Sequence, residues 1–549
     1  MKRLIWTLFL SLFLINLAYA CTTPSDGLSI TANTEFCSGN HPINTEMTVD
    51  ASNLVLNCNG TVLNVTYADS IHVFRLKESN ITIKGCTFDS NAPDTGNGFN
   101  LSTAIGQTDG GDTTGSNDNF INNTFLNIYY GINLQASTDS ENIHVFNNTF
   151  NRVGMGFTLS KNNLNNLKFN NNYLINITGA PTQINLANSL SNFEFIGNRI
   201  VTTVYGAANC HVNGAPGINN ATISNNYVSG LGVIEFGTQT IFSLTASNPG
   251  IVSNAMINNN TVENTWGYLI NLASSISNIS ILNNTFNNSG YDAMQISTTS
   301  AENVLIDGNL LINAGNWTIN VPSQSVSDFV ISNNRVVNAD NYGIMIYASS
   351  GDITITGNNI QMNPDAFIEN GQTGVYFSDG GGTATVSYSD NQISAPNGVE
   401  MFLVRSTKVT MVGGGNEFTG PPNVWPNNIN NIFLGQGVIS INASEEPSLN
   451  VSTNVTLNLG SSMCPATIYY YPDFTRSFAT IKSGGQVCNA GSDPVCTNIQ
   501  CTGNTLTFTV PHFDSYGAEG TVNVPEFNLT TIILVMIVTL FGISIIRKK

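Results

Sequence analysis

Charged residues are scarce in this sequence of 549 residues, where Asp, Glu, Lys and Arg together make up only 9%. The balance among them is acidic, with 35 acidic residues against 17 basic ones and a net charge of −18. A protein that binds nucleic acid needs a basic surface to neutralise phosphates, so this composition excludes that class of partner. Solubility must therefore come from Asn, Ser, Thr and Gly.

Cysteine is also infrequent, and none of the nine cysteines stands in a Cys-x-x-Cys pair, which argues against a structural zinc site. In an extracellular setting we expect disulfides instead. Near the N-terminus we predict a bridge between Cys37 and Cys58. The late cysteines allow three connectivities, of which we favour two local bridges: Cys464, Cys488, Cys496 and Cys501. The odd total leaves at least one thiol unpaired or intermolecular.

Both ends of the chain carry long apolar runs. Residues 1–20 have a basic start, a short apolar core and an Ala-x-Ala ending, which predicts a secretory signal peptide. Residues 528–546 form a second apolar run, long enough to span a bilayer as a helix, and the basic residues 547–549 follow at once. The positive-inside rule then predicts a cytoplasmic C-terminus and an extracellular ectodomain anchored in the plasma membrane. The 17 Asn-x-Ser/Thr sequons suit a cell-surface glycoprotein.

The C-terminal tail also resembles the PEF-CTERM sorting signal of archaeal surface proteins. The resemblance rests on Pro525-Glu526-Phe527, the apolar span and the basic cluster. It implies that a sortase-like enzyme processes the tail and replaces it with another anchor, whereas the residues alone predict a retained helix.

Paired asparagines interrupt apolar segments at regular intervals along most of the chain, as in VFNNTF at 145–150. Eight of the eleven gaps between the aligned asparagines lie between 24 and 26 residues. The aligned positions are Asn123, Asn148, Asn172, Asn198, Asn226, Asn260, Asn284, Asn309, Asn334, Asn358, Asn391 and Asn416. Cys58 and Cys86 hold the corresponding place in two earlier units, which gives about fourteen.

A period near 25 residues is compatible with a leucine-rich repeat, whose core pattern Ile143-x-Val145-x-x-Asn148-x-Phe150 matches. However, each unit has Ile, Val and Phe in place of Leu, and its second half is another strand, such as GINL at 131–134, rather than a helix. The units thus resemble the coils of the pectin-lyase-like superfamily, which implies a right-handed parallel β-helix. Asparagine tolerates the left-handed conformation of a tight corner, and its side chains can stack between coils, so we interpret Asn147 and Asn148 as corner residues.

This pattern predicts an all-β protein with the following order of parts. The signal peptide at 1–20 precedes a β-helix with its N-terminal cap at 21–440 and a linker at 441–449. A small disulfide-bearing β-sandwich follows at 450–520, then a linker at 521–527, a transmembrane helix at 528–546 and the basic tail at 547–549.

One strand of each coil presents an outward residue, and these residues form a predicted ladder of amides and hydroxyls. Aromatic residues such as Tyr268, Tyr347 and Trp266 lie near it. Amides can bond sugar hydroxyls and aromatic faces can stack on sugar rings, so we predict carbohydrate binding here. The ladder comprises Asn133, Thr158, Asn185, Asn271, Gln295, Asn320, Met345, Tyr376 and Glu400. A polar exterior without a ligand is the alternative explanation.

Insertions break the period in several places, and the first of them is acidic. Asp109, Asp112 and Asp118 supply hard oxygen ligands, so calcium is the cofactor we consider there. The alternative is a solvated loop.

The resemblance also raises the possibility of a polysaccharide lyase or a glycoside hydrolase. The polygalacturonases of the superfamily carry neighbouring aspartates, a Gly-His-Gly and an Arg-x-Lys, whereas this chain has no Asp-Asp pair and no Gly-His-Gly. Arg75-Leu76-Lys77 lies in an early coil, without the neighbouring aspartates of that motif. We therefore favour a cell-surface protein that binds carbohydrate or serves adhesion or envelope structure, with the enzyme as the alternative.

Overall fold

The computed structural model describes residues 21–65, 72–90, 102–107, 115–135, 138–202, 210–230, 240–265, 267–366, 372–395, 398–405, 408–413, 415–420, 431–435 and 437–522. The chain divides into two compact units, the first ending at Ser406 and the second beginning at Thr407. The predicted signal peptide at 1–20 and the predicted membrane span at 528–546 lie outside the described residues. Within the described part, no helix is long and apolar enough to cross a membrane.

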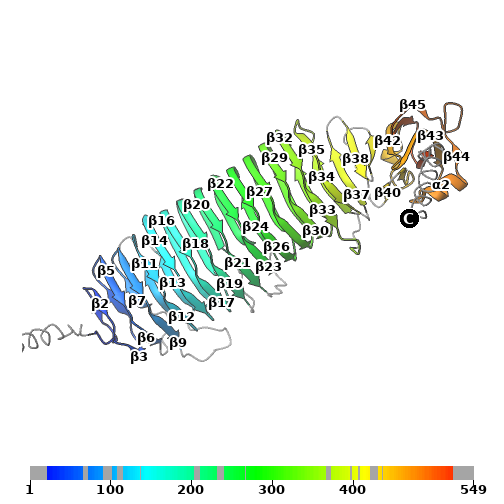
Figure 1. Cartoon of the computed structure of the whole chain (residues 1–549). Helices are drawn as coiled ribbons and strands as arrows, with labels where there is room; N and C mark the ends of the chain where they lie inside the picture. Colours follow the sequence, from blue (N-terminus) through cyan, green and yellow to red (C-terminus); the bar gives the residue numbers. More distant parts are fainter. Residues whose placement is uncertain are drawn as a thin grey trace, which may run out of the picture. The chain divides into compact units, whose positions relative to one another are not determined.

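The first unit is a parallel β-solenoid of twelve or more turns, each with three faces (Figure 1). Face 2 is a sheet of 14 short strands, one from each turn. Its strands are β3 (Gly39–Ile43), β6 (Thr61–Val65), β9 (Thr87–Ser90), β12 (Thr124–Leu126), β15 (Thr149–Asn151), β17 (Tyr173–Ile175), β19 (Arg199–Thr202), β21 (Tyr227–Gly230), β23 (Thr261–Thr265), β26 (Thr285–Ser289), β28 (Leu310–Ala314), β30 (Arg335–Ala339), β33 (Asn359–Met362) and β36 (Gln392–Ser394).

Face 1 precedes face 2 in each turn, and face 3 follows it. Some face 1 strands are separate: β2 (Thr34–Glu35), β5 (Leu54–Asn57), β8 (Ile81–Lys84), β11 (Asn119–Ile121), β14 (Ser140–Phe146), β25 (Ser275–Leu282), β32 (Asp352–Thr356) and β35 (Thr385–Ser389). The separate face 3 strands are β1 (Ser29–Ile30), β4 (Met47–Val49), β7 (His72–Leu76), β10 (Thr103–Gln107), β13 (Tyr130–Gln135), β24 (Tyr268–Ala273), β31 (Tyr342–Tyr347), β34 (Gln372–Ser378) and β37 (Gly398–Val404). Six long strands run from face 3 of one turn to face 1 of the next: β16 (Met155–Asn170), β18 (Thr182–Ile196), β20 (Cys210–Ser224), β22 (Thr240–Asn258), β27 (Met294–Asp307) and β29 (Trp317–Ser332).

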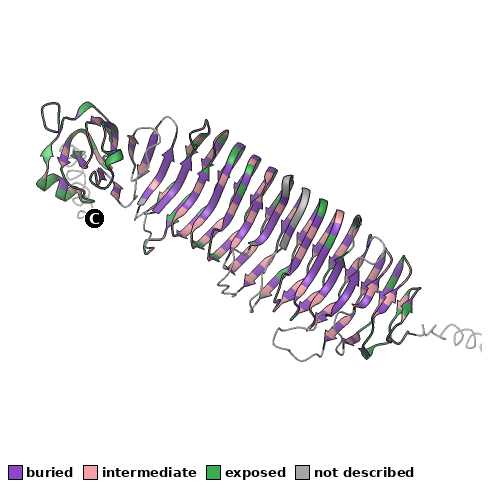
Figure 2. Cartoon of the chain, turned by 180° about the vertical axis from the view of Figure 1, so that it is seen from behind, coloured by how far each residue is buried: buried purple, intermediate pink, exposed green. Residues whose placement is uncertain are grey.

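Burial alternates along the strands, so that buried residues form rows that run from turn to turn (Figure 2). The interior is filled with Ile, Val, Leu and Phe, as the sequence predicts. Phe88, Phe125 and Phe150 stack on one another in successive turns, with ring centroids 5.2 and 4.6 Å apart. Such rows follow from a parallel in-register pairing, because equivalent side chains of neighbouring turns meet inside the solenoid.

The paired asparagines close the corner between faces 1 and 2, and the two members of a pair have different roles. Asn147 adopts a left-handed conformation, with φ of 56°. Asn148 is buried, and both its backbone N–H and its Nδ2 donate to Oδ1 of Asn172, at 3.0 and 3.1 Å. Its Nδ2 also donates to the carbonyl of Phe120, at 2.8 Å. The interpretation as corner residues is confirmed.

The same bonds repeat as a continuous buried ladder, which we call the asparagine ladder. It comprises Asn123, Asn148, Asn172, Asn198, Asn226, Asn260, Asn284, Asn309, Asn334, Asn358 and Asn391. The aligned Asn416 does not belong to it, because this residue lies in an antiparallel strand of the second unit and donates to the carbonyl of Val438.

Four disulfides are present in the described residues: Cys21–Cys37, Cys58–Cys86, Cys464–Cys501 and Cys488–Cys496. The predicted pairing of Cys37 with Cys58 is wrong. Cys58 and Cys86 instead occupy equivalent corner positions of neighbouring turns, with Cα atoms 4.7 Å apart, and Cys86 N–H donates to Oδ1 of Asn123. The bridge therefore continues the asparagine ladder. The late cysteines form two bridges among themselves, as predicted, but the bridges are nested: Cys488–Cys496, with a sequence separation of 8, lies within Cys464–Cys501, with a separation of 37.

The second unit contains two antiparallel sheets. One has the order β38 (Val409–Gly413), β39 (Asn416–Gly420), β42 (Thr453–Asn458), β46 (Thr505–Val510) and β45 (Thr497–Thr502). The other has the order β40 (Ile432–Gly435), β41 (Val438–Ile441), β47 (Ser515–Val522), β43 (Ser462–Tyr471) and β44 (Gln486–Val487). The helices η2 (Pro447–Leu449) and α2 (Phe478–Gly484) complete the unit.

Aromatic residues of the two sheets pack together, with the rings of Phe508 in β46 and Tyr516 in β47 5.9 Å apart. Because β38 to β41 pair within these sheets, the division of the chain falls at 406–407, whereas the sequence places the end of the solenoid at 440 and the start of the next part at 450.

Candidate functional site

Most members of the predicted ladder lie in one outward row of face 3. Thr158 pairs with Asn133 of the preceding turn, and the pairs Asn271–Gln295, Gln295–Asn320, Asn320–Met345 and Met345–Tyr376 continue the row farther along. Asn185 and Glu400 are not in it. Gln183 takes the place next to Thr158, and Phe402 takes the place next to Tyr376. Each of these two predicted positions is offset by two residues from the residue in the row. Such an offset keeps the side chain on the same side of the strand but places it in another row.

The row is accessible only along part of its length. Asn133 and Thr158 are buried near one end, and Tyr376 and Phe402 are buried near the other. Between these ends, partly or fully exposed aromatic and amide side chains cluster on β24, on β31 and around the starts of β27 and β29. We call this cluster the aromatic–amide face, and it comprises Tyr268, Asn271, Tyr291, Gln295, Trp317 and Tyr342.

The rings of the aromatic–amide face contact one another at steep angles. Tyr268 and Tyr291 lie 5.2 Å apart at 76°, and Trp317 and Tyr342 lie 6.4 Å apart at 60°. Tyr342 in turn contacts the buried Tyr376 at 5.6 Å. Because neighbouring turns are held at the strand spacing, these contacts place aromatic surface on each of several consecutive turns.

A buried carboxylate, Asp292, organises the middle of this face. Its side chain is fully buried and accepts three hydrogen bonds, from the backbone N–H of Trp317 at 3.2 Å and from Nδ2 of Asn316 and Asn320 at 3.1 and 3.0 Å. Burial raises its pKa, although the three bonds counteract this. Burial and the charge of Asp292 together raise the pKa of Tyr268. Asp292 therefore fixes the turn that carries Trp317.

Two buried polar atoms of the face have no hydrogen-bond partner within the described part of the chain: Nε1 of Trp317 and Oδ1 of Asn271. Leaving a buried donor or acceptor unpaired costs about 1–3 kcal/mol for each group. Because both atoms are buried, a ligand hydroxyl reaches them only after neighbouring side chains move.

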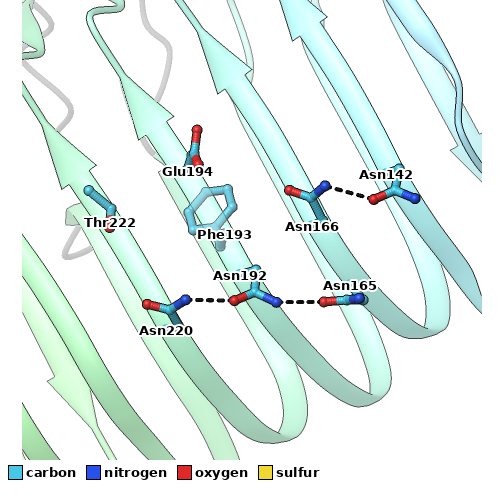
Figure 3. Close-up of a pocket in the computed structure, with 8 residues that line it drawn as sticks. All are labelled: Asn142, Asn165, Asn166, Asn192, Phe193, Glu194, Asn220 and Thr222. Carbon is cyan, nitrogen blue, oxygen red and sulfur yellow. Dashed lines mark hydrogen bonds between the residues drawn. The ribbon is translucent and has the colours of Figure 1, made fainter.

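A second candidate is a groove of about 380 Å³ on face 1 (Figure 3). It is lined by Asn142, Asn165, Asn166, Asn192, Phe193, Glu194, Asn220 and Thr222. Its amides largely bond one another, as when Nδ2 of Asn220 donates to Oδ1 of Asn192 at 2.6 Å and Nδ2 of Asn192 donates to Oδ1 of Asn165 at 2.8 Å.

The carboxylate of this groove is also engaged, because Glu194 pairs with Lys168 at 3.0 Å and accepts from Nδ2 of Asn170 at 3.0 Å. The groove therefore offers a ligand fewer unpaired groups and less apolar surface than the aromatic–amide face does.

The predicted calcium ligands are only partly within the described residues, since Asp109 and Asp112 lie outside them. Asp118 is fully buried, and its Oδ1 accepts from the backbone N–H of Ile81 at 2.9 Å. Burial raises its pKa to about 7. This carboxylate points into the solenoid, and the described residues contain no cluster of three potential metal ligands. Calcium binding remains a prediction.

Asp292, Tyr291 and Trp317 were not among the residues selected from the sequence. Asp292 occurs in the turn before Asn316 and Trp317, at a distance that matches the period of the repeat. An acid placed one period before an amide, next to aromatic residues, was the available signal.

A family model described as "Right handed beta helix region" matches residues 202–369 and, in an overlapping alignment, residues 252–416. The first unit is a right-handed β-helix. No protein of curated function matches the chain significantly.

Among solved structures, the β-helix has low similarity to several proteins. The A-module of mannuronan C-5 epimerase AlgE6 from Azotobacter vinelandii is 13% identical, covers 68% of this chain and 94% of its own, and gives a TM-score of 0.30. A tailspike protein mutant of E. coli bacteriophage HK620, in complex with a hexasaccharide, is 10% identical. The alignment covers 91% of this chain and 83% of the tailspike chain and gives a TM-score of 0.33. The alginate lyase AlyF-OU02 is 13% identical, and the alignment covers 68% of this chain and 81% of the lyase chain with a TM-score of 0.24. These low values carry no argument about function.

Proposed function

We propose that this protein is a cell-surface β-helix that binds carbohydrate through the aromatic–amide face. The observation that carries the proposal is the series of aromatic rings on consecutive turns, from Tyr268 to Tyr342, with amides between them. Sugar rings present flat C–H surfaces to aromatic rings and hydroxyls to amides, and binding sites for such ligands combine apolar surface with a few polar groups.

The ligand we expect is a neutral saccharide. The residues of the aromatic–amide face carry no formal charge, and the carboxylate next to them, that of Asp292, is buried and hydrogen-bonded. An anionic polymer would find no basic partner in this set of residues. A neutral polymer can instead use the exposed surface of the aromatic rings and the amide groups of this face.

The location at the cell surface is part of the proposal. It rests on the signal-like residues 1–20, the apolar run at 528–546 with the basic residues after it, and disulfides in both units. In this proposal the second unit, with its two antiparallel sheets, is a small β-sandwich that precedes the anchor. Archaeal origin and processing by a sortase-like enzyme are finer possibilities that the tail suggests.

Retention of the detergent-solubilised full chain on immobilised neutral polysaccharides would test the binding. We expect Trp317→Ala to lower the affinity about tenfold or more, because it removes a stacking ring. Phe146→Ala is the matched control, since Phe146 is an exposed aromatic residue on face 1. Equal retention of the two variants, or no retention of the unchanged protein by any neutral polymer, would exclude this site.

The lyase or hydrolase alternative is tested in the same samples by measuring new reducing ends and unsaturated products. Asp292 is the buried carboxylate with a raised pKa at this site, but its bonds to Asn316, Trp317 and Asn320 suit a positioning role. Product formation that disappears in Asp292→Asn would replace the binding proposal by catalysis.

A further inference from the structure

An arginine on face 2 lies between two tyrosines of the neighbouring turns. In the outward row of this sheet, Arg199 in β19 pairs with Tyr173 in β17 on one side and with Tyr227 in β21 on the other. The guanidinium carbon lies 5.1 Å from the ring centroid of Tyr173 and 5.4 Å from that of Tyr227. We call these three residues the Tyr–Arg–Tyr stack.

The two rings hold the guanidinium in place while the side chain remains exposed to solvent. A cation between two aromatic faces gains attraction from both, and each such contact is worth about 0.5–1 kcal/mol at an exposed site. Glu263 reinforces the arrangement, because its carboxylate accepts a hydrogen bond from the hydroxyl of Tyr227 at 3.1 Å. The arginine is therefore ordered by stacking.

Arg199 forms no ion pair with a carboxylate among the described residues, in contrast to four other basic residues of the chain. Arg75, Lys77, Lys168 and Lys482 each form an ion pair. The guanidinium presents up to five N–H donors in a rigid planar fork, which matches the two oxygens of a carboxylate or of a sulfate. Arg199 is thus an exposed cation that two rings hold in place and that forms no ion pair within the described part of the chain.

We propose that the Tyr–Arg–Tyr stack binds the oxyanion of an acidic saccharide, a carboxylate or a sulfate, with Arg199 as its ligand. The two tyrosine rings provide flat apolar surface next to the guanidinium, and the hydroxyl of Tyr173 adds a polar group. The site is on face 2, so it is separate from the aromatic–amide face and does not depend on the neutral ligand proposed there.

The solenoid provides a matched control in the same outward row. Arg335 in β30 is also an exposed arginine on face 2, but its neighbours in register are Leu310 and Asn359 rather than tyrosines. Replacing either arginine changes the net charge equally. A difference in probe affinity between the two variants is therefore caused by the loss of the Tyr–Arg–Tyr stack and not by the change in net charge.

The experiment is a titration of the full chain in detergent at low salt with three probes: oligogalacturonate for carboxylates, dextran sulfate for sulfates and dextran as the neutral polymer. We expect one of the two anionic probes to bind and dextran not to bind to this site. Arg199→Gln should lower the affinity for the anionic probe at least tenfold, and Arg199→Lys should lower it by an intermediate factor. Arg335→Gln should lower it less than twofold. The probe that binds identifies the oxyanion.

Three results would overturn the proposal: no binding of either anionic probe, an equal loss of affinity in Arg199→Gln and Arg335→Gln, or no loss of affinity in either variant. Thermal unfolding of each variant checks that the β-helix is intact. Should Arg199→Gln prove unstable, Tyr173→Leu with the arginine retained gives the second measurement, and unchanged affinity there would also refute the role of the stack. Loss of neutral-polymer binding in Trp317→Ala is independent of all these outcomes.

Discussion

Substitution of one buried asparagine in the middle of the asparagine ladder should have a large, local effect on stability. Asn284 is buried, and its Oδ1 accepts from the backbone N–H of Asn260 at 3.0 Å. Its Nδ2 donates to the carbonyl of Ile257 at 2.9 Å and to Oδ1 of Asn309 at 3.0 Å. Asn284→Ala removes these bonds, whereas the bond from the backbone N–H of Asn284 to Asn309 remains.

The magnitude follows from the groups that lose a partner. The N–H of Asn260 and the carbonyl of Ile257 each lose a hydrogen bond to the side chain in a buried environment, and each such loss costs about 1–3 kcal/mol. We expect a total near 3 kcal/mol. Asn283→Gly is the control, because Asn283 is exposed and left-handed, with φ of 53°, a conformation that glycine adopts without strain. Its effect should be within about 0.5 kcal/mol.

Hydrogen exchange measured by mass spectrometry is the appropriate assay, since a solenoid can open turn by turn rather than as one unit. A loss of about 3 kcal/mol corresponds to a roughly hundredfold lower protection in the turns around residue 284. Similar protection in Asn284→Ala and Asn283→Gly would show that the asparagine ladder does not stabilise the corners, and the reasoning would be refuted.

Three further predictions concern the same unit. Burial raises the pKa of Asp118 from 3.8 to about 7. Because of this carboxyl group, the unchanged protein should lose roughly 4 kcal/mol of stability as pH rises between these values. Asp118→Asn should abolish that loss, which denaturant titrations at several pH values would measure. Replacing Cys58 and Cys86 by serine opens a loop with a sequence separation of 28 residues, which should cost about 3.5 kcal/mol and lower the midpoint of thermal unfolding. Gly308→Ala should destabilise more than a typical surface change, because φ is 66° and the new Cβ would lie 2.5 Å from Oδ1 of Asn283; calorimetry would detect it.

The repeat made the fold predictable because the corner imposes a strict requirement. A left-handed residue such as Asn147 followed by an inward amide such as Asn148 recurs in each turn, so the period was visible in one sequence. The error at Asn416 shows the limit of this signal. Its spacing and its neighbours match the pattern, but β39 pairs in antiparallel fashion, and pairing direction leaves no mark in so short a segment.

The candidate site was less predictable, because outward residues lie under no comparable constraint. Asn185 and Glu400 were misplaced by two residues since the start of a strand can shift without changing which side chains face outward. The Cys58–Cys86 bridge was missed for a different reason. Both cysteines occupy ladder positions, and neighbouring ladder positions lie close enough for a disulfide, whereas Cys37 pairs with Cys21.

Polar residues that stabilise the fold lie apart from those at the aromatic–amide face of face 3, and this separation agrees with the proposed binding there. Corners and the asparagine ladder satisfy the backbone and hold the turns in register, so these two roles do not fall on the outward row of face 3. Nevertheless, the residues at and beneath the aromatic–amide face include a buried carboxylate, Asp292, and an unpaired buried donor on Trp317, both of which reduce stability. A solenoid could replace either residue by the polar or apolar residues found on its other turns. Features that cost stability next to exposed aromatic rings agree with the proposed binding of a ligand at this face.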